Sequence, residues 1–236
     1  MLQVALNGRR SRTESRFVPL TTPAIVQDIQ LCVQAGVTSV HFHVRDKAGN
    51  ESLRAADVAA QLLAIREAVP GIPLGISTGE WITPGERLQH IERWEVIPDF
   101  VSVNFGEPDH LEIAQAVLAK EIGIEAGVNH LSAAHNLIRS GLLPQCFRIL
   151  LEPEEEELGK AIQTVIAIEA LLSAHLTSRQ SLLLHGTGYT CWPLLELAGS
   201  KGYQARIGLE DILYLPGGHE PVDNVTMVQY ALRRSY

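Results

Sequence analysis

Two short charged motifs, far apart in the chain, carry the side chains best suited to chemistry. In the first, His41 and His43 stand two residues apart within the segment VHFHVRD at residues 40–46. Residues two apart on an extended strand share a face, so both imidazoles can reach one metal ion. A catalytic metal site needs a third protein ligand and an open position. A pair of hydrogen-bonded core histidines is the competing interpretation.

The second motif, RIGLED at residues 206–211, contains Glu210, the best candidate for the third ligand. Two histidines and one carboxylate suit Zn²⁺, with water or substrate in the remaining place. Arg206 and Asp211 flank Glu210 and could form a charge-assisted pair that keeps Asp211 ionised as a base for an acidified C–H. The same pair could instead be a structural salt bridge. Other candidates for the third ligand are Glu125, Glu152 and His185.

Short apolar runs alternate with amphipathic stretches along the chain, which predicts alternating strands and helices. The expected strands are residues 2–6, 39–44, 73–77, 100–105, 123–128, 148–153, 181–186 and 204–209. The expected helices lie near residues 23–35, 56–69, 84–93, 108–120, 130–140, 155–175, 190–200 and 222–234. This alternation predicts a parallel sheet, and its evenness favours a closed (β/α)8 TIM barrel that forms a single domain over residues 1–236.

In such a barrel the active site forms at the carboxyl ends of the strands. Polar residues collect at these predicted ends, where burying them without a purpose would be costly. We therefore expect them to meet the two charged motifs there. Besides the motifs, they include Arg9, Arg10, Ser77, Ser102, Asn104, Glu125, Glu152 and His185.

The composition limits the classes of function. The 236 residues carry a net charge of −8, which argues against non-specific nucleic-acid binding. No apolar run reaches the roughly 18 residues of a membrane span, and the chain opens without the pattern of a secretory signal. The three dispersed cysteines, Cys32, Cys146 and Cys191, are typical of reduced, buried thiols. We expect a cytoplasmic protein.

The two motifs together resemble the β-keto acid cleavage enzyme family, whose founding activity is 3-keto-5-aminohexanoate cleavage. The resemblance rests on HFHVRDKAGNESL at residues 41–53 and ARIGLEDILYLPGG at residues 205–218. It extends to ALNGRR, ISTGE, VSVNFG, GIEAGV and LLLHGTG, and so covers nearly the whole chain. It implies a zinc-dependent TIM barrel, a homo-oligomer (dimer or tetramer), that uses acetyl-CoA to turn a β-keto acid into acetoacetate and a new acyl-CoA.

The resemblance also implies roles for single residues. His41, His43 and Glu210 would bind zinc, and Asp211, oriented by Arg206, would take a proton from the substrate. Glu125 would support the Arg206–Asp211 pair. The positions that would hold the substrate or its oxygens are Ser77, Ser102 and Asn104.

This chain departs from the founding member in the loop after the first strand. That enzyme has an acid there, suited to a substrate amino group, whereas this chain has Arg9 and Arg10. We expect an anionic or neutral β-keto acid. If the substrate has a distal carboxylate, we expect Arg9 or Arg10 to bind it. The same arginines could instead hold CoA phosphates or face solvent. Glu80 stands where the family often has a glycine, so the loop after the third strand is expected to differ.

Two other functions fit parts of the pattern. Metal-dependent hydrolases on the same barrel also use two histidines with this spacing, but usually on the first strand, with further histidines on the fifth and sixth. A non-catalytic barrel that binds a metabolite or metal is the other alternative, although the full set of site residues argues against it.

Overall fold

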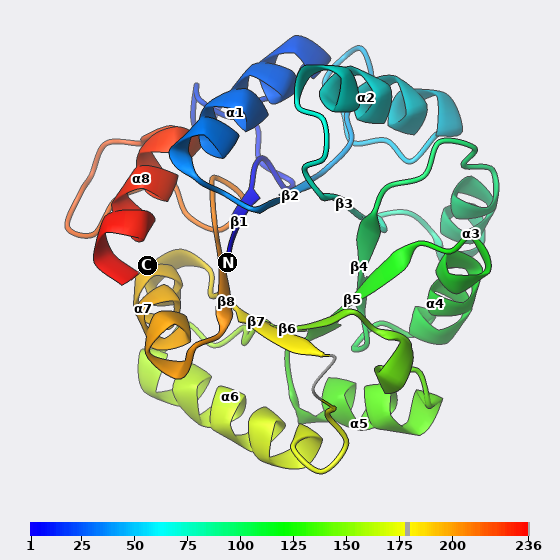
Figure 1. Cartoon of the computed structure of the whole chain (residues 1–236), viewed down its shortest axis with the longest axis vertical. Coiled ribbons are helices and arrows are strands. Elements are labelled where there is room, and N and C mark those ends of the chain that lie inside the picture. Colours follow the sequence, from blue (N-terminus) through cyan, green and yellow to red (C-terminus); the bar gives the residue numbers. More distant parts are fainter. Residues whose placement is uncertain (178–179, 236) are drawn as a thin grey trace.

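Eight parallel strands close into a barrel and alternate with helices in the computed structural model, which describes residues 1–177 and 180–235 (Figure 1). β1 pairs with β2 and also with β8, which places Gln3 opposite Arg206 where the barrel closes. The predicted (β/α)8 TIM barrel is confirmed. The strands are β1 (Leu2–Ala5), β2 (Ser39–Phe42), β3 (Leu74–Ser77), β4 (Phe100–Asn104), β5 (Gly123–Val128), β6 (Arg148–Leu151), β7 (Ser181–Leu184) and β8 (Gln204–Ile207).

The helices form a ring outside the strands (Figure 1). They are α1 (Thr22–Ala35), α2 (Ala55–Ala68), α3 (Pro84–Glu92), α4 (His110–Ala119), α5 (Leu131–Ser140), α6 (Leu158–Leu172), α7 (Cys191–Lys201) and α8 (Asn224–Ser235), with short 3-10 turns η1 (Leu143–Gln145) and η2 (Gly188–Thr190). Within the described residues, no helix has both the length and the apolar character that crossing a membrane requires.

The alternation of side chains along β2 decides which residues face the site. Val40, Phe42 and Val44 are buried in the apolar core, so the intervening His41 and His43 point the other way, into the barrel. This confirms the strand geometry predicted from the spacing. The ladder of β2 stops at Phe42, two residues earlier than predicted, because a side chain replaces the neighbouring strand: Asn7 accepts a hydrogen bond from the backbone N–H of His43 at 2.8 Å.

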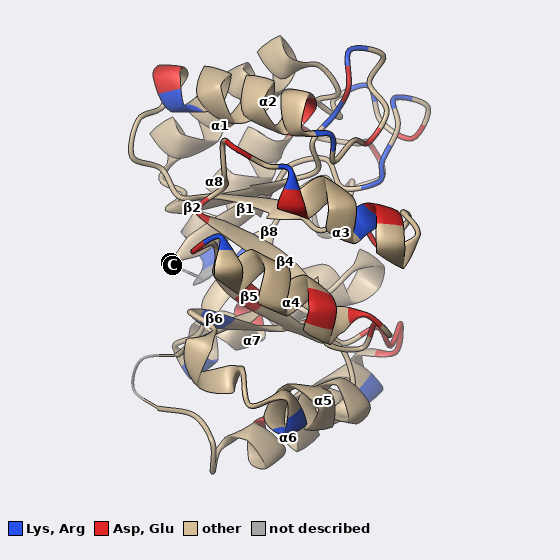
Figure 2. Ribbon diagram, turned by 90° about the vertical axis from the view of Figure 1, so that its right-hand side faces the viewer, with Lys and Arg blue, Asp and Glu red and all other residues tan. Residues whose placement is uncertain are grey.

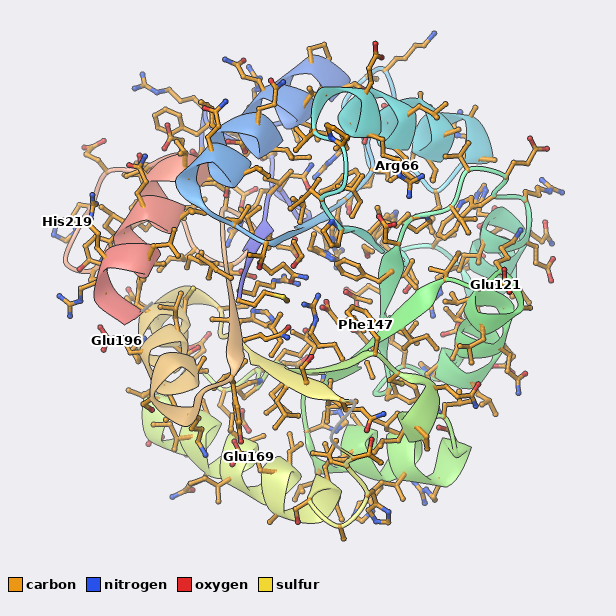
Figure 3. All side chains as sticks on the ribbon, viewed as in Figure 1. Arg66, Glu121, Phe147, Glu169, Glu196 and His219 are labelled. Carbon is orange, nitrogen blue, oxygen red and sulfur yellow. The ribbon has the colours of Figure 1, made fainter. Side chains whose placement is uncertain are left out.

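Side chains occupy the interior of the barrel (Figure 3). The ring of Phe100 occupies the space beside Gly75, where an added Cβ would lie 1.9 Å from the ring. The guanidinium of Arg148 is buried and lies 5.1 Å from the centroid of Phe100 and 4.9 Å from that of Phe147. Phe147 is labelled near the middle of the barrel in Figure 3. Inside the barrel, these side chains fill the space towards the amino ends of the strands.

One predicted helix is shorter than expected. The helix expected near residues 155–175 is α6, which begins at Leu158; its first turn holds no acid, so the acidic residues at 154–157 lie in the preceding loop. Glu155 instead accepts a hydrogen bond from the hydroxyl of Thr164, so its side chain folds back onto the helix. The three cysteines are buried free thiols, as predicted, and burial raises the pKa of Cys146 to about 12.

Candidate metal and substrate site

His41, His43 and Glu210 come together at the carboxyl ends of β2 and β8, on either side of β1. Their possible ligand atoms all lie within 4.8 Å of one another. The Oε2 atom of Glu210 is 3.6 Å from Nε2 of His41, and its Oε1 atom is 3.6 Å from Nε2 of His43. The structure thus brings together the three residues predicted to bind metal.

The donor set fits a divalent cation such as zinc. The Oε2 atom of Glu210 is buried and accepts no hydrogen bond from the part of the chain that the structure describes. An unpartnered buried carboxylate oxygen is costly, and a cation between it and the two imidazoles would remove that cost. Two imidazoles and one carboxylate, with space for another ligand, are typical of catalytic zinc sites.

Burial and nearby charges set the protonation states of the three clustered side chains. Burial lowers the pKa of His41 to about 4, so this imidazole is neutral at pH 7. Burial would raise the pKa of Glu210, but Arg206 and the two histidines hold it well below its usual range. Burial also opposes protonation of His43, yet Glu210 and Glu51 raise its pKa. A bound cation would replace a proton on this ring.

Glu51 supports His43 from behind. Its carboxylate contacts Nδ1 of His43, which leaves Nε2 of the ring facing Glu210. Glu51 reaches this place because Asp46 closes a turn, accepting hydrogen bonds from the backbone N–H groups of Ala48 and Asn50 at 2.8 and 2.9 Å. A carboxylate on the second nitrogen of a metal-binding histidine fixes the ring orientation. The sequence analysis missed Glu51; the turn-forming DKAGN segment before it was the available signal.

Arg45 holds the loop after β1 against the site. Its guanidinium donates to the backbone carbonyls of Gly8 and Arg10, the latter at 3.3 Å. Gly8 has a φ of +47°, and a Cβ on it would lie 2.4 Å from Cγ of Glu210. Glycine is therefore needed here both for the backbone conformation and for the close approach of Glu210. The arginine of the first motif thus positions the loop that borders the metal cluster.

Arg206 holds the two acids of the second motif together. Its Nη2 atom lies 2.6 Å from Oε1 of Glu210 and 2.9 Å from Oδ1 of Asp211. Asp211 has no exposed surface. Burial alone would raise the pKa of Asp211, but Arg206 and His185 lower it, so the carboxylate stays ionised. The charge-assisted pair suggested by the sequence is present, next to the metal cluster.

His185 lies between two acids, Glu152 and Asp211. Nε2 of His185 lies 3.4 Å from Oε2 of Glu152, and its Nδ1 atom lies 3.4 Å from Oδ1 of Asp211. Burial and Arg206 lower the pKa of His185, but Asp211 and Glu152 outweigh them and raise it to about 9. Among the described residues, neither His185 nor Glu152 belongs to the metal cluster. Glu210 is therefore the carboxylate beside the two histidines.

Glu125 is paired with an arginine on the neighbouring strand, and its expected support of the Arg206–Asp211 pair stays a prediction. Glu125 and Arg148 lie opposite each other on β5 and β6, and they form a fully buried ion pair. Glu125 also accepts hydrogen bonds from Gln3 at 3.3 Å and Ser102 at 3.1 Å. Glu125 thus braces the floor of the site, and the charges of Arg148 and Arg206 lower its pKa against the effect of burial.

A cavity of about 350 Å³ opens above the metal cluster, and Ser77, Ser102, Asn104 and Arg10 all line it. These are the four residues predicted to contact the substrate. The hydroxyl of Ser102 also lies 3.4 Å from Nδ1 of His41. Gly127 makes room behind Asn104, since a Cβ there would lie 2.4 Å from its Oδ1 atom.

Acidic residues accompany the arginines at the mouth of the cavity. Arg9 forms an ion pair with Glu80 at 2.8 Å, and Arg10 forms one with Glu14 at the same distance. Both arginines line the cavity and keep part of their surface exposed. Glu107, which also lines it, is held by the buried guanidinium of Arg87, a pair that the sequence analysis did not anticipate.

Comparisons with known proteins agree with this geometry. The model of the beta-keto acid cleavage enzyme family matches residues 1–234. A 3-keto-5-aminohexanoate cleavage enzyme from Acetoanaerobium sticklandii is 24% identical over 238 residues, covering 92% of this chain and 84% of its own. A 3-oxoadipate:acetyl-CoA acetyltransferase from Cupriavidus necator is 35% identical over 80 residues, or 34% of this chain and 28% of its own.

Among solved structures, a ternary complex of ObcA with a C4-CoA adduct and oxalate has the same fold, with a TM-score of 0.72 at 17% identity. The match covers 93% of this chain, which spans 64% of the ObcA chain.

Proposed function

The chain belongs to the β-keto acid cleavage enzyme family, and we propose that it is a zinc-dependent acyltransferase that converts a β-keto acid and acetyl-CoA into acetoacetate and a new acyl-CoA. The observation that carries this proposal is a buried, ionised Asp211 beside the cluster of His41, His43 and Glu210. Such a carboxylate is suited to take a proton from a carbon acid held at the cluster.

Zinc held by His41, His43 and Glu210 would act as a Lewis acid that acidifies the C–H between the two carbonyl groups of the substrate. Asp211 then takes that proton, and Arg206 keeps the carboxylate in place. Ser77, Ser102 and Asn104 line the same cavity and are placed to hold substrate oxygens.

The reaction needs only one proton to be carried, and Asp211 takes it and later returns it. The substrate carbanion attacks the thioester carbonyl of acetyl-CoA, a C–C bond forms, and the CoA thiolate leaves. The thiolate attacks the original ketone, and the bond between that ketone and the central carbon breaks. The products are the new acyl-CoA and the carbanion of acetoacetate, which recovers the proton from Asp211.

The mouth of the cavity favours a β-keto acid with a second carboxylate. Arg10 lines the cavity, and its pairing with Glu14 through one terminal nitrogen leaves other N–H groups for a ligand. The relative named as a 3-oxoadipate:acetyl-CoA acetyltransferase acts, by its name, on such a dicarboxylate. An amino-substituted substrate would instead use Glu14, Glu80 or Glu107.

A panel of β-keto acids incubated with acetyl-CoA tests the proposal, with the CoA esters identified by mass spectrometry. We expect a new acyl-CoA and acetoacetate in equal amounts, and the highest rate with a dicarboxylate. Substrate loss without acetyl-CoA would instead indicate a hydrolase, and preference for an amino-substituted acid would contradict the role of Arg10. The homo-oligomeric state and the cytoplasmic location remain predictions.

A further inference from the structure

The loop between β1 and α1 is strongly basic in an otherwise acidic chain. Residues 9–16 read RRSRTESR and contain four of the 19 Lys and Arg residues of a chain whose net charge is −8. In Figure 2, Lys and Arg segments appear, together with Asp and Glu segments, on the loops that project at the upper right of the molecule. Residues 9–16 hold four arginines against one acid, Glu14, and Arg9 and Arg10 of this segment line the cavity.

Two of these arginines already have acidic partners, and two do not. Arg9 pairs with Glu80, and Arg10 pairs with Glu14. Arg12 and Arg16 are exposed. Within the described residues, neither forms an ion pair, and Arg16 lies over the ring of Phe17 at 4.8 Å. Their guanidinium groups are therefore available to an anionic ligand.

The loop is held firmly next to the cavity. Arg45 donates to the backbone carbonyls of Gly8 and Arg10, and the backbone N–H of Ser11 donates to Glu14 at 2.9 Å. Since neighbouring Cα atoms are about 3.8 Å apart, the Cα of Arg12 lies within about 8 Å of that of Arg10, which lines the cavity. Arg12 thus lies close to the entrance of the site, and Arg16 lies further along the same loop.

We propose that Arg12 and Arg16 bind the phosphate groups of CoA. This inference rests on the proposed function, which brings the thioester of acetyl-CoA to the metal cluster. The flexible pantetheine arm then extends out of the cavity and leaves the diphosphate and the ribose phosphate at its edge. Guanidinium groups pair well with phosphates, and a local basic loop on an acidic protein attracts a polyanionic substrate.

The test compares two acyl donors on the double variant Arg12→Gln with Arg16→Gln. Acetyl-CoA carries the phosphates, whereas acetyl-N-acetylcysteamine carries the same thioester without them. We expect the KM for acetyl-CoA to rise about tenfold, which corresponds to about 1.4 kcal/mol, with kcat unchanged. The KM for the truncated donor should stay the same. The matched control removes two other surface charges, Arg139→Gln on α5 and Lys160→Gln on α6, and should alter neither KM.

The other possible results separate a failure of the phosphate site from a failure of the proposed function. An unchanged KM for acetyl-CoA, or an equal rise with both donors, would overturn the assignment of the phosphates to these arginines. If the wild type exchanges acyl groups with neither donor, the proposed function fails instead. Calorimetric binding of CoA itself then tests the arginines separately, with inorganic phosphate as the competitor: binding weakened in the double variant but not in the control supports the site, and equal binding refutes it.

Discussion

Glu51 contacts Nδ1 of His43 and so leaves Nε2 of that ring directed at Glu210. The ring of Trp81 stacks on the same imidazole, with centroids 5.4 Å apart. His43 is therefore fixed in rotation and tilt before any ligand arrives. Because the His43 side chain is already ordered, less conformational entropy is lost when a metal binds to it.

Replacing Glu51 by glutamine should weaken metal binding by about 10- to 100-fold, because the amide is a weaker partner for the imidazole N–H than a carboxylate. Competition with a chromogenic chelator measures the zinc affinity of each variant. Glu67→Gln, an exposed acid on α2, is the matched control and should bind zinc like the wild type. Equal affinity in the Glu51 variant would show that this contact does not support the metal site.

Removing the metal should abolish acyl exchange, and adding zinc should restore it. The buried Oε2 atom of Glu210 lacks a hydrogen bond within the described residues, so zinc should also stabilise the fold, by about 4 kcal/mol at a free concentration 1,000 times its Kd. Thermal unfolding with and without zinc measures this gain. His41→Ala should show no such gain, and full activity in the stripped protein would exclude a catalytic metal.

Asp211→Asn should lower kcat by about 10²- to 10⁴-fold, the usual contribution of a positioned base. Zinc affinity should change little, because Asp211 is not one of the three clustered ligands. Steady-state kinetics and a zinc titration on the same preparation separate the two effects. Undiminished turnover would favour another base, and absence of turnover in the wild type as well would favour a binding protein.

The metal cluster could be predicted from sequence because its geometry follows from strand periodicity and strand order. His41 and His43 share a face of β2, and only β1 separates that strand from the end of β8, which carries Glu210. The contact of Glu51 could not be predicted in this way, since it depends on a turn that reverses the chain after β2. The partner of Glu125 depends on the register between β5 and β6, which the sequence does not encode locally.

Asp28 on α1 should make stability depend on pH. Burial raises its pKa from 3.8 to about 7, although a hydrogen bond from Asn224 at 2.6 Å partly opposes this rise and the charge of Asp223 adds to it. The folded state thus holds a proton that the unfolded state releases, so the free energy of unfolding should fall as the pH rises from about 4 to about 7.

Asp28→Asn should remove that part of the pH dependence, because the amide oxygen still accepts from Asn224 and cannot ionise. Urea unfolding at pH 5 and pH 8 measures the difference, with the exposed Glu92→Gln on α3 as the control. The variant should be more stable than the wild type at pH 8. A pH dependence identical to that of the wild type would assign it to other groups.

Glu125 and Arg148 offer a test of whether Glu125 positions the site or takes part in the reaction. Both side chains are almost fully buried, so Glu125→Gln should leave an unpaired buried cation and cost about 3–5 kcal/mol of unfolding free energy. Arg148→Met in the same chain removes that cation and should recover most of the loss. If Glu125 only braces the floor, turnover should recover with stability in the double variant. Stability restored without turnover would instead show that the Glu125 carboxylate itself is needed for the reaction.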